Sequence, residues 1–201
     1  MPLSTASADD LLDYWGSTYG KYISLHSAWS ATGGNELSGG SPAYARLAAS
    51  WSSAASNSKA LSGTPYSFNA PASSTVAFIG FWDALTSGNF HEMVPAGNAT
   101  AYTFAAPSST DTLLAPGSAY ATNQPVCVFP TAGSVLPSGL TAGTIYYAVS
   151  VSGDSFELSA TSGGSAINLT ADGSGYVQAI TVESFSGAGT FTLSNGSQSL
   201  V

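Results

Sequence analysis

Two carboxylates have the residue types and the spacing of a hydrolytic pair. Asp83 and Glu92 flank residues 86–89, Thr-Ser-Gly-Asn, which indicate a turn between two strands. Glycoside hydrolases place two carboxyl groups about 5–5.5 or 6.5–9.5 Å apart around the scissile bond, a separation that such a hairpin could supply. An aspartate at the end of a strand, however, commonly accepts hydrogen bonds from the backbone of the following turn, and we favour that role for Asp83.

The two histidines could in principle join carboxylates in a metal site. His26 lies in an alternating stretch, and His91 directly precedes Glu92. Glu36, Asp83 or Glu92 could supply oxygen ligands. No HxH, HxxxH or CxxC spacing supports such a site. We therefore expect no metal and no cofactor, and we expect both histidines to face solvent or a subunit interface.

Other motifs of catalysis or ion binding are incomplete. Serine is abundant, but no GxSxG nucleophile elbow occurs. Residues 172–175, Asp-Gly-Ser-Gly, resemble a fragment of a calcium loop, but the further acidic positions are missing, so a glycine turn is the simpler interpretation. We expect no catalytic residues and no enzymatic activity.

One stretch, residues 22–46, organises the rest of the chain. Residues 22–27 alternate apolar and polar side chains, as in a half-buried strand, and two glycine-rich steps follow. The loop carries Glu36, and Arg46 comes after it in a chain with only three Lys plus Arg. We hypothesise that Glu36 and Arg46 pair and hold the loop on the sheet. The alternative is two solvated surface charges, worth together under about 1 kcal/mol.

Four tryptophans are candidates for contacts with a partner. Trp82 ends a strongly apolar run and is predicted to lie in the core, and Trp51 lies in a Ser/Ala-rich strand or loop. Trp15 lies on the predicted N-terminal helix, which must dock on a sheet or on another subunit. Trp29 flanks a loop and is the best candidate to stack on a sugar or to anchor a protein contact. Alternatively, all four pack inside. The predicted interface or ligand contacts are Trp15, Trp29, Glu36 and Arg46.

The composition excludes some functional classes. Charged residues make up only 7% of the 201 residues, the net charge is −8, and no Lys or Arg follows Lys59. Nucleic-acid binding needs clustered cations, so that class is excluded, and attraction to anionic membranes falls with it. No apolar run approaches the roughly 20 residues that span a bilayer, so no membrane insertion is expected. A chain this poor in charge fits a particle component better than a free enzyme.

The pattern along the chain predicts an all-β protein: an antiparallel β-sandwich with a short N-terminal helix, plus a second small β-sandwich or barrel module. The helix falls within residues 1–21, and the strongest strand is 75–82. We expect an N-terminal sandwich over 1–109 and a small module over 110–182. Alternation in the tail suggests that 183–201 closes the first domain, which would make the module an insertion.

Four motifs carry a resemblance to known proteins. They are SLH at 24–26, TGGNELSGG at 32–40, YAR at 44–46 and GFWDALTSGN at 80–89. In this order they resemble small virion proteins of tailed phages, especially phages of actinobacteria, of the tail-fibre, minor-tail and head-decoration kinds. Residues 136–164 are similar to a module of phage appendage proteins.

The resemblance implies a non-enzymatic structural protein on the virion surface, made in the host cytoplasm. Its partners would be other virion proteins, either major capsid or tail proteins, and copies of itself, with a trimer favoured. The single copy of the module favours a compact decoration or tail-associated subunit over a long fibre. A receptor- or glycan-binding tail tip that reads a host surface glycan is the alternative, and a glycan hydrolase follows it.

Overall fold

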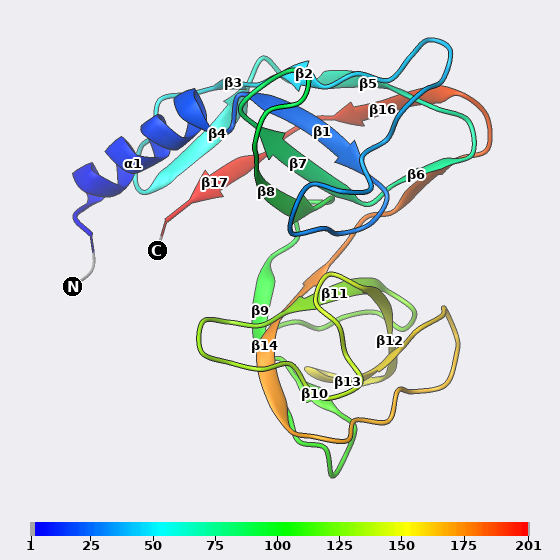
Figure 1. The fold of residues 1–201 in the computed structure, drawn as a ribbon. Helices are drawn as coiled ribbons and strands as arrows, with labels where there is room; N and C mark the ends of the chain where they lie inside the picture. The colour runs from blue at the N-terminus through cyan, green and yellow to red at the C-terminus, as the bar shows by residue number, and fades with distance from the viewer. Residues whose placement is uncertain (1–2, 201) are drawn as a thin grey trace. The chain divides into compact units, whose positions relative to one another are not determined.

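The computed structural model describes residues 3–200, which form two compact units. The first unit contains the chain up to Val94 and the strands from Glu183 onward, and the second contains Pro95–Val182. The second unit is therefore inserted between two segments of the first (Figure 1). The fold class is confirmed: within the described residues the chain is mostly β, with one short N-terminal helix, antiparallel sheets and a closed barrel.

The first unit begins with helix α1, Thr5–Thr18. Ser4 caps it by accepting a hydrogen bond from the Ser7 amide at 3.2 Å. The helix ends where Gly20 donates to the Trp15 carbonyl at 2.9 Å, and a Cβ at Gly20 would lie within 2.6 Å of the Trp15 ring. Its buried residues are Ala8, Leu12 and Gly16, so a narrow stripe of mostly small side chains packs on the sheet side.

A four-stranded antiparallel sheet forms the centre of the first unit. Its order is β2-β1-β7-β8, with bounds Leu47–Ala48, Tyr22–His26, Phe78–Trp82 and Phe90–Pro95. Strands β1 and β7 pair from Tyr22 opposite Trp82 to His26 opposite Phe78. All five residues of β7 are buried, as the apolar run predicts for a central strand covered on both faces.

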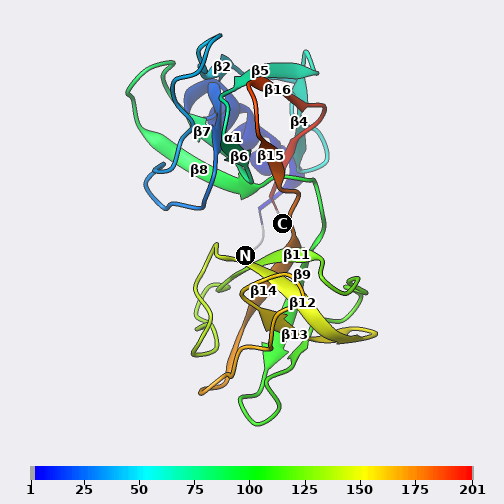
Figure 2. The same ribbon diagram turned by 90° about the vertical axis from the view of Figure 1, so that its right-hand side faces the viewer.

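The tail of the chain completes the first unit. Strands β15 (Glu183–Phe185) and β16 (Gly189–Leu193) pair antiparallel with β6 (Ser74–Val76) and β5 (Tyr66–Ala70), respectively (Figure 2). Strand β17 (Ser197–Ser199) pairs antiparallel with β4 (Ser58–Ser62) (Figure 1). Strand β3, Ser50–Trp51, pairs with the other edge of β4. The predicted strand 75–82 is interrupted at Ala77, so β6 and β7 join different sheets.

The second unit is a closed six-stranded barrel of order β10-β13-β12-β11-β14-β9. Its strands are β9 (Ala101–Ala106), β10 (Leu113–Leu114), β11 (Pro125–Phe129), β12 (Ile145–Ser152), β13 (Ser155–Ser159) and β14 (Gly173–Ala179). Fully buried side chains such as Leu113, Val126, Phe156 and Val177 fill the interior, so the barrel has a packed core.

The unit begins earlier than the module expected from residue 110. The reason is that β9 pairs with β14 over six positions, from Ala106 opposite Gly173 to Ala101 opposite Gln178. Without β9 the barrel would be left open between β10 and β14.

Candidate functional site

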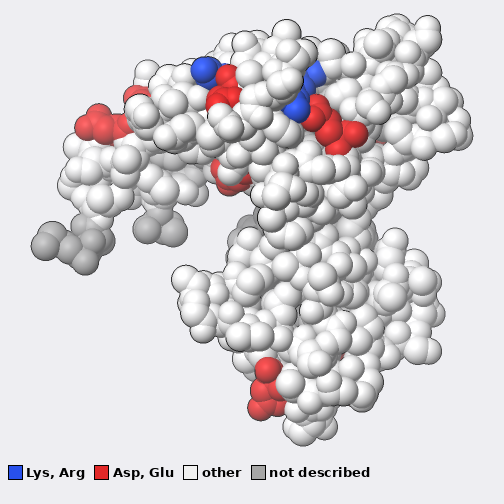
Figure 3. Space-filling model, viewed as in Figure 1, with Lys and Arg blue, Asp and Glu red and all other residues white. Residues whose placement is uncertain are grey.

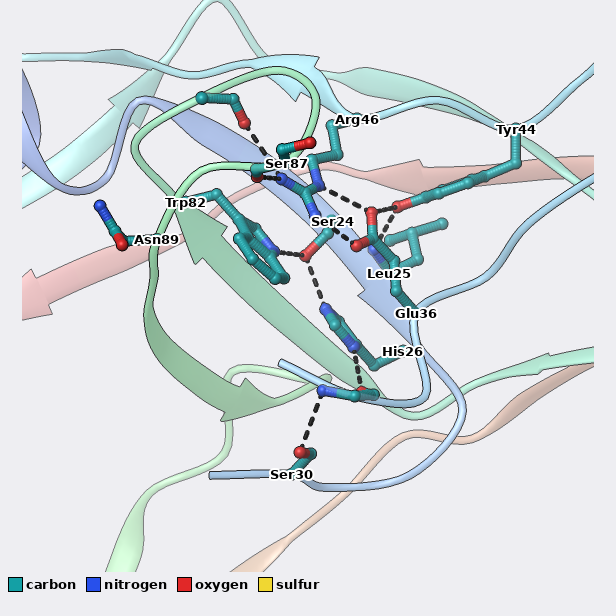
Figure 4. Close-up of polar contacts among 12 residues, drawn as sticks. Ser24, Leu25, His26, Ser30, Glu36, Tyr44, Arg46, Trp82, Ser87 and Asn89 are labelled. Carbon is teal, nitrogen blue, oxygen red and sulfur yellow. Dashed lines mark hydrogen bonds and ion pairs between the residues drawn. The ribbon is translucent and has the colours of Figure 1, made fainter. Parts of the chain in front are cut away.

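Arg46 is the centre of a polar cluster in the first unit (Figure 4). Its side chain is only 10% exposed, and that of Glu36 is 20% exposed. The guanidinium Nε donates to Glu36 Oε1 at 2.9 Å and Nη2 donates to Glu36 Oε2 at 2.7 Å. This two-point geometry is the strong form of an arginine–carboxylate pair. The hypothesised pairing of Glu36 with Arg46 is confirmed.

The same guanidinium also holds the turn that follows β7. Its Nη1 donates to the carbonyls of Ala84 at 3.1 Å and Ser87 at 2.8 Å. Its central carbon lies 3.5 Å from the centroid of the Trp82 ring, a cation–π contact. One side chain therefore ties the loop that carries Glu36 to the turn at 83–89.

Tyr44 joins this cluster from the loop that leads to Arg46. Its hydroxyl donates to Glu36 Oε1 at 3.2 Å and accepts from the Leu25 amide of β1 at 2.9 Å. Burial raises the pKa of the Tyr44 hydroxyl well above its usual range, so the group stays a neutral donor. We call Glu36, Tyr44, Arg46 and Trp82 the arginine hub.

A second buried pair lies beside the arginine hub on β1. Ser24 Oγ is 2.6 Å from His26 Nε2, and His26 Nδ1 is 2.8 Å from the Gly34 carbonyl. Because that carbonyl can only accept, Nδ1 carries the proton and Nε2 accepts from the Ser24 hydroxyl. Trp82 Nε1 donates to Ser24 Oγ at 2.9 Å, which links this pair to the hub.

His26 does not face solvent or an interface, contrary to the expectation from its sequence. Both Ser24 and His26 are 0% exposed. Burial lowers the pKa of the imidazole, which favours its neutral form. A Cβ at Gly80 on β7 would lie 2.5 Å from both His26 Nε2 and Ser24 Oγ, so the pair requires glycine opposite it. A substrate cannot reach this serine unless the sheet unpacks, so the pair has a structural role.

Asp83 has the turn-capping role that we favoured. Its Oδ1 accepts from the Asn89 amide at 2.7 Å and its Oδ2 accepts from Asn89 Nδ2 at 2.8 Å. These bonds lower the pKa of the carboxyl, and His91 Nε2 lies 3.5 Å away. Glu92 has different neighbours: it accepts from Gln198 Nε2 of β17 at 3.1 Å. The two carboxylates are thus engaged by different partners.

The predicted contact tryptophans lie in different surroundings. Trp15 is half-buried and packs edge-on against Trp51 and Phe81, with ring centroids 5.3 and 5.4 Å away. Trp29 is half-buried in the loop after β1, and its carbonyl accepts from Asn35 Nδ2 at 3.4 Å. The structure brings Glu36 and Arg46 together, whereas Trp15 packs in the aromatic group with Trp51 and Phe81. A contact of these four residues with a partner stays a prediction.

Sequence reasoning missed Tyr44 and the contact of Trp82 with arginine. Tyr44 belongs to the YAR motif, two residues before Arg46, so its position was a usable signal. The carbonyls of Ala84 and Ser87 left no such signal, because any residue type supplies a carbonyl.

Within residues 3–200, no three His, Cys, Asp or Glu side chains group as metal ligands. No helix in this range is both long and apolar enough to cross a membrane. Asp172 instead accepts from the amide and the hydroxyl of Ser108, at 2.7 and 2.8 Å, and so holds a loop of the barrel.

Comparison with known proteins identifies one family. The family model described as podophage GP4 fiber I protein gp80 matches residues 3–103. This segment contains all four motifs and every residue of the arginine hub. No curated protein and no solved structure shows significant similarity to the chain. The match ends before residues 136–164, so their resemblance to an appendage module, like the actinobacteriophage assignment, stays a prediction.

Proposed function

Because the chain belongs to the podophage GP4 fiber I protein gp80 family, we propose that it is a non-enzymatic subunit of a phage tail that works through contacts with other virion proteins and with its own copies. The family match over residues 3–103 is the observation that carries this proposal. It favours a tail position over decoration of the capsid, because the family is one of fibre proteins.

The charge distribution supports assembly as the mode of action. The chain has 3 Lys plus Arg, and two of these cations are paired within the first unit, Arg46 with Glu36 and Lys59 with Asp13. Charged side chains are sparse on the face shown in Figure 3. Contacts over such a surface bury few charges, so they avoid the desolvation penalty of buried ions.

The sheets also offer edges to neighbours. Strands β2 and β8 lie at the two edges of the central sheet. An open edge can pair with another chain, so these edges are candidates for contacts with neighbouring subunits. We propose a closed homo-oligomer, and the resemblance to phage appendage proteins favours a trimer.

The arginine hub agrees with a function through fixed contacts. It joins three stretches of the chain, at 36, 44–46 and 82–87, through charge-assisted hydrogen bonds. Such a network rigidifies the loops that it joins, as a surface that binds other subunits requires. The enclosed Ser24–His26 pair and the capped Asp83 agree with a non-enzymatic role.

Quantitative mass spectrometry of purified virions tests the proposal. We expect this chain in the particle at a few copies to a few tens of copies, and gold-labelled antibody at the tail. A stoichiometry near that of the major capsid protein would contradict the tail position. Absence from washed virions would contradict the function as a whole.

Receptor binding is the second candidate, and Trp29 is the residue that favours it. Trp29 is partly exposed on a loop in which Asn35 Nδ2 donates to the Trp29 carbonyl and the Gly34 amide donates to Ser30 Oγ. Such indoles stack on sugar rings. Glycan-array binding that Trp29→Ala abolishes and Trp51→Phe retains would support this candidate.

A further inference from the structure

A pocket of about 450 Å³ opens in the first unit between α1, β8 and β17. Leu11, Tyr14, Trp15 and Tyr19 line it from the helix and its C-terminal end, and Glu92 and Gln198 line it from the strands. The lining is therefore mostly apolar and aromatic, with one carboxylate. Such a composition is typical of sites that recognise a ligand by shape and orient it by a single polar contact.

Glu92 is a half-buried carboxylate on β8. Its Oε2 accepts from Gln198 Nε2 at 3.1 Å. Among residues 3–200, no lysine, arginine or histidine forms an ion pair with it. Burial raises the pKa of this carboxyl, because the apolar surroundings disfavour the charged form. Such a charge is costly to the isolated fold, and this cost is common at functional sites.

The apolar surface continues beyond the pocket along α1. Leu11 is 49% exposed and Tyr14 is 55% exposed, while Leu3, just before the helix, is 56% exposed. Leu11 and Tyr14 are three residues apart and share one face of the helix. The buried residues Ala8, Leu12 and Gly16 attach the helix to the rest of the unit, so Leu11 and Tyr14 are left at the surface. We call Leu3, Leu11 and Tyr14 the apolar strip. An elongated surface of this kind suits a peptide segment better than a small molecule.

The charge balance indicates what this segment carries. A second copy of this chain has a net charge of −8 and offers few cations. Arg46 and Lys59 are 10% and 5% exposed and are already paired, which leaves Lys21 as the third cation of the sequence. Each further copy therefore offers one exposed cation, Lys21, against 11 Asp and Glu residues, which favours a different protein as the source of the cation that complements Glu92.

We propose that this pocket binds an apolar–basic peptide segment of another virion protein, which places a Lys or Arg side chain on Glu92 and apolar side chains on Leu11 and Tyr14. This inference rests on the proposed function, because it supplies the partner chemistry for attachment to the particle. The pair would be shielded by the aromatic wall of Trp15 and Tyr19, where a charge contact is stronger than at an open surface.

A peptide array tests the proposal. The full chain, fluorescently labelled, is applied to overlapping peptides of about 15 residues that cover the other structural proteins of the same phage. We expect the bound peptides to share a Lys or Arg flanked by apolar residues. The best peptide is then titrated in solution next to a copy in which norleucine replaces that cation. We expect at least ~10-fold weaker binding of the norleucine peptide, or about 1.4 kcal/mol.

Variants of the chain locate the contact. Glu92→Gln keeps the shape of the pocket and removes its charge. It is expected to weaken binding of the basic peptide by at least ~10-fold and to leave binding of the norleucine peptide unchanged. Glu183→Gln is the matched control, because it makes the same change at an exposed position of β15 and is expected to leave binding unchanged. Leu11→Ser should weaken the binding of both peptides.

Other outcomes overturn the proposal. Equal binding by Glu92→Gln, or no peptide bound at all, would exclude a cationic segment in this pocket. An oligomer that Leu11→Ser converts to a monomer would show that a second copy covers the apolar strip. If any of these occurs while the chain is still found in virion tails, the proposed function stands and the partner chemistry fails. Absence from virions removes the proposed function, whatever the peptides do.

Discussion

Replacing Arg46 by methionine should destabilise the first unit by about 3 kcal/mol. The substitution removes four hydrogen bonds and leaves Glu36 with the Tyr44 hydroxyl as its hydrogen-bond donor. Breaking a fully buried ion pair costs about 3–5 kcal/mol, and an exposed pair is worth about 0–1 kcal/mol. With side chains 10% and 20% exposed, this pair lies near the buried limit, which places the cost at its lower end.

Urea denaturation followed by tryptophan fluorescence measures this change. All four tryptophans, at 15, 29, 51 and 82, lie in the first unit, so their emission reports its unfolding and not that of the barrel. Lys21→Met is the matched control: it removes an exposed cation and should change the free energy of unfolding by less than about 0.5 kcal/mol.

A double-mutant cycle separates the pair from the rest of the hub. Glu36→Gln combined with Arg46→Met should show a coupling energy of about 2 kcal/mol, because neither group has a charged partner once the other is gone. A loss for Arg46→Met no larger than that for Lys21→Met, or a coupling energy near zero, would refute the reasoning. The two residues would then behave as solvated surface charges.

Three other perturbations test separate features of the first unit. Glu92→Gln should raise the urea midpoint at pH 7 and not at pH 4, because a carboxyl with a raised pKa costs the folded state stability as pH rises above its unfolded value of 4.5; an unchanged midpoint at pH 7 would contradict the burial of this charge. In the Glu92→Gln variant, the effect of His26 can be measured separately, because burial lowers the pKa of this imidazole from 6.5. The free energy of unfolding should fall as pH drops below about 6.5, by up to about 1.4 kcal/mol per pH unit, since the unfolded chain takes up a proton that the folded chain rejects. A flat midpoint between pH 7.5 and pH 5, or the same slope in His26→Gln, would argue against this. Gly80→Ala should cost about 1–3 kcal/mol, because the added methyl meets the Ser24–His26 pair, whereas Gly187→Ala, where a Cβ meets open space, should be close to neutral; equal effects of the two would remove the packing argument.

The fold class was predictable because its signals are local. Short alternating runs separated by glycine turns indicate antiparallel strands, and the continuous apolar run at 75–82 indicates a strand covered on both faces. The pairing of Glu36 with Arg46 was also within reach, because cations are so scarce in this chain. Whether the two residues form a pair or remain solvated surface charges depends on their burial, which a single sequence does not report.

His26 shows where local patterns end. An alternating strand has one buried and one exposed face only if the sheet is covered on one side. Strand β1 lies next to β7 inside the central sheet and is covered on both sides, so Ser24 and His26 are buried together with Ile23 and Leu25. Their polar atoms are satisfied by each other and by Gly34, a partner eight residues away.

The sequence by itself determined the β class, the single N-terminal helix, the poverty in cations and the motifs that lead to the phage fibre family. Only the tertiary structure decided that β9 closes the barrel, that Arg46 stacks on Trp82, and that Glu92 shares a pocket with α1 and β17. The physical reason is distance along the chain. Helix α1 and strand β17 are nearly the whole chain apart, and contacts between such distant segments form only when a long stretch of chain is closed, which local sequence patterns do not report.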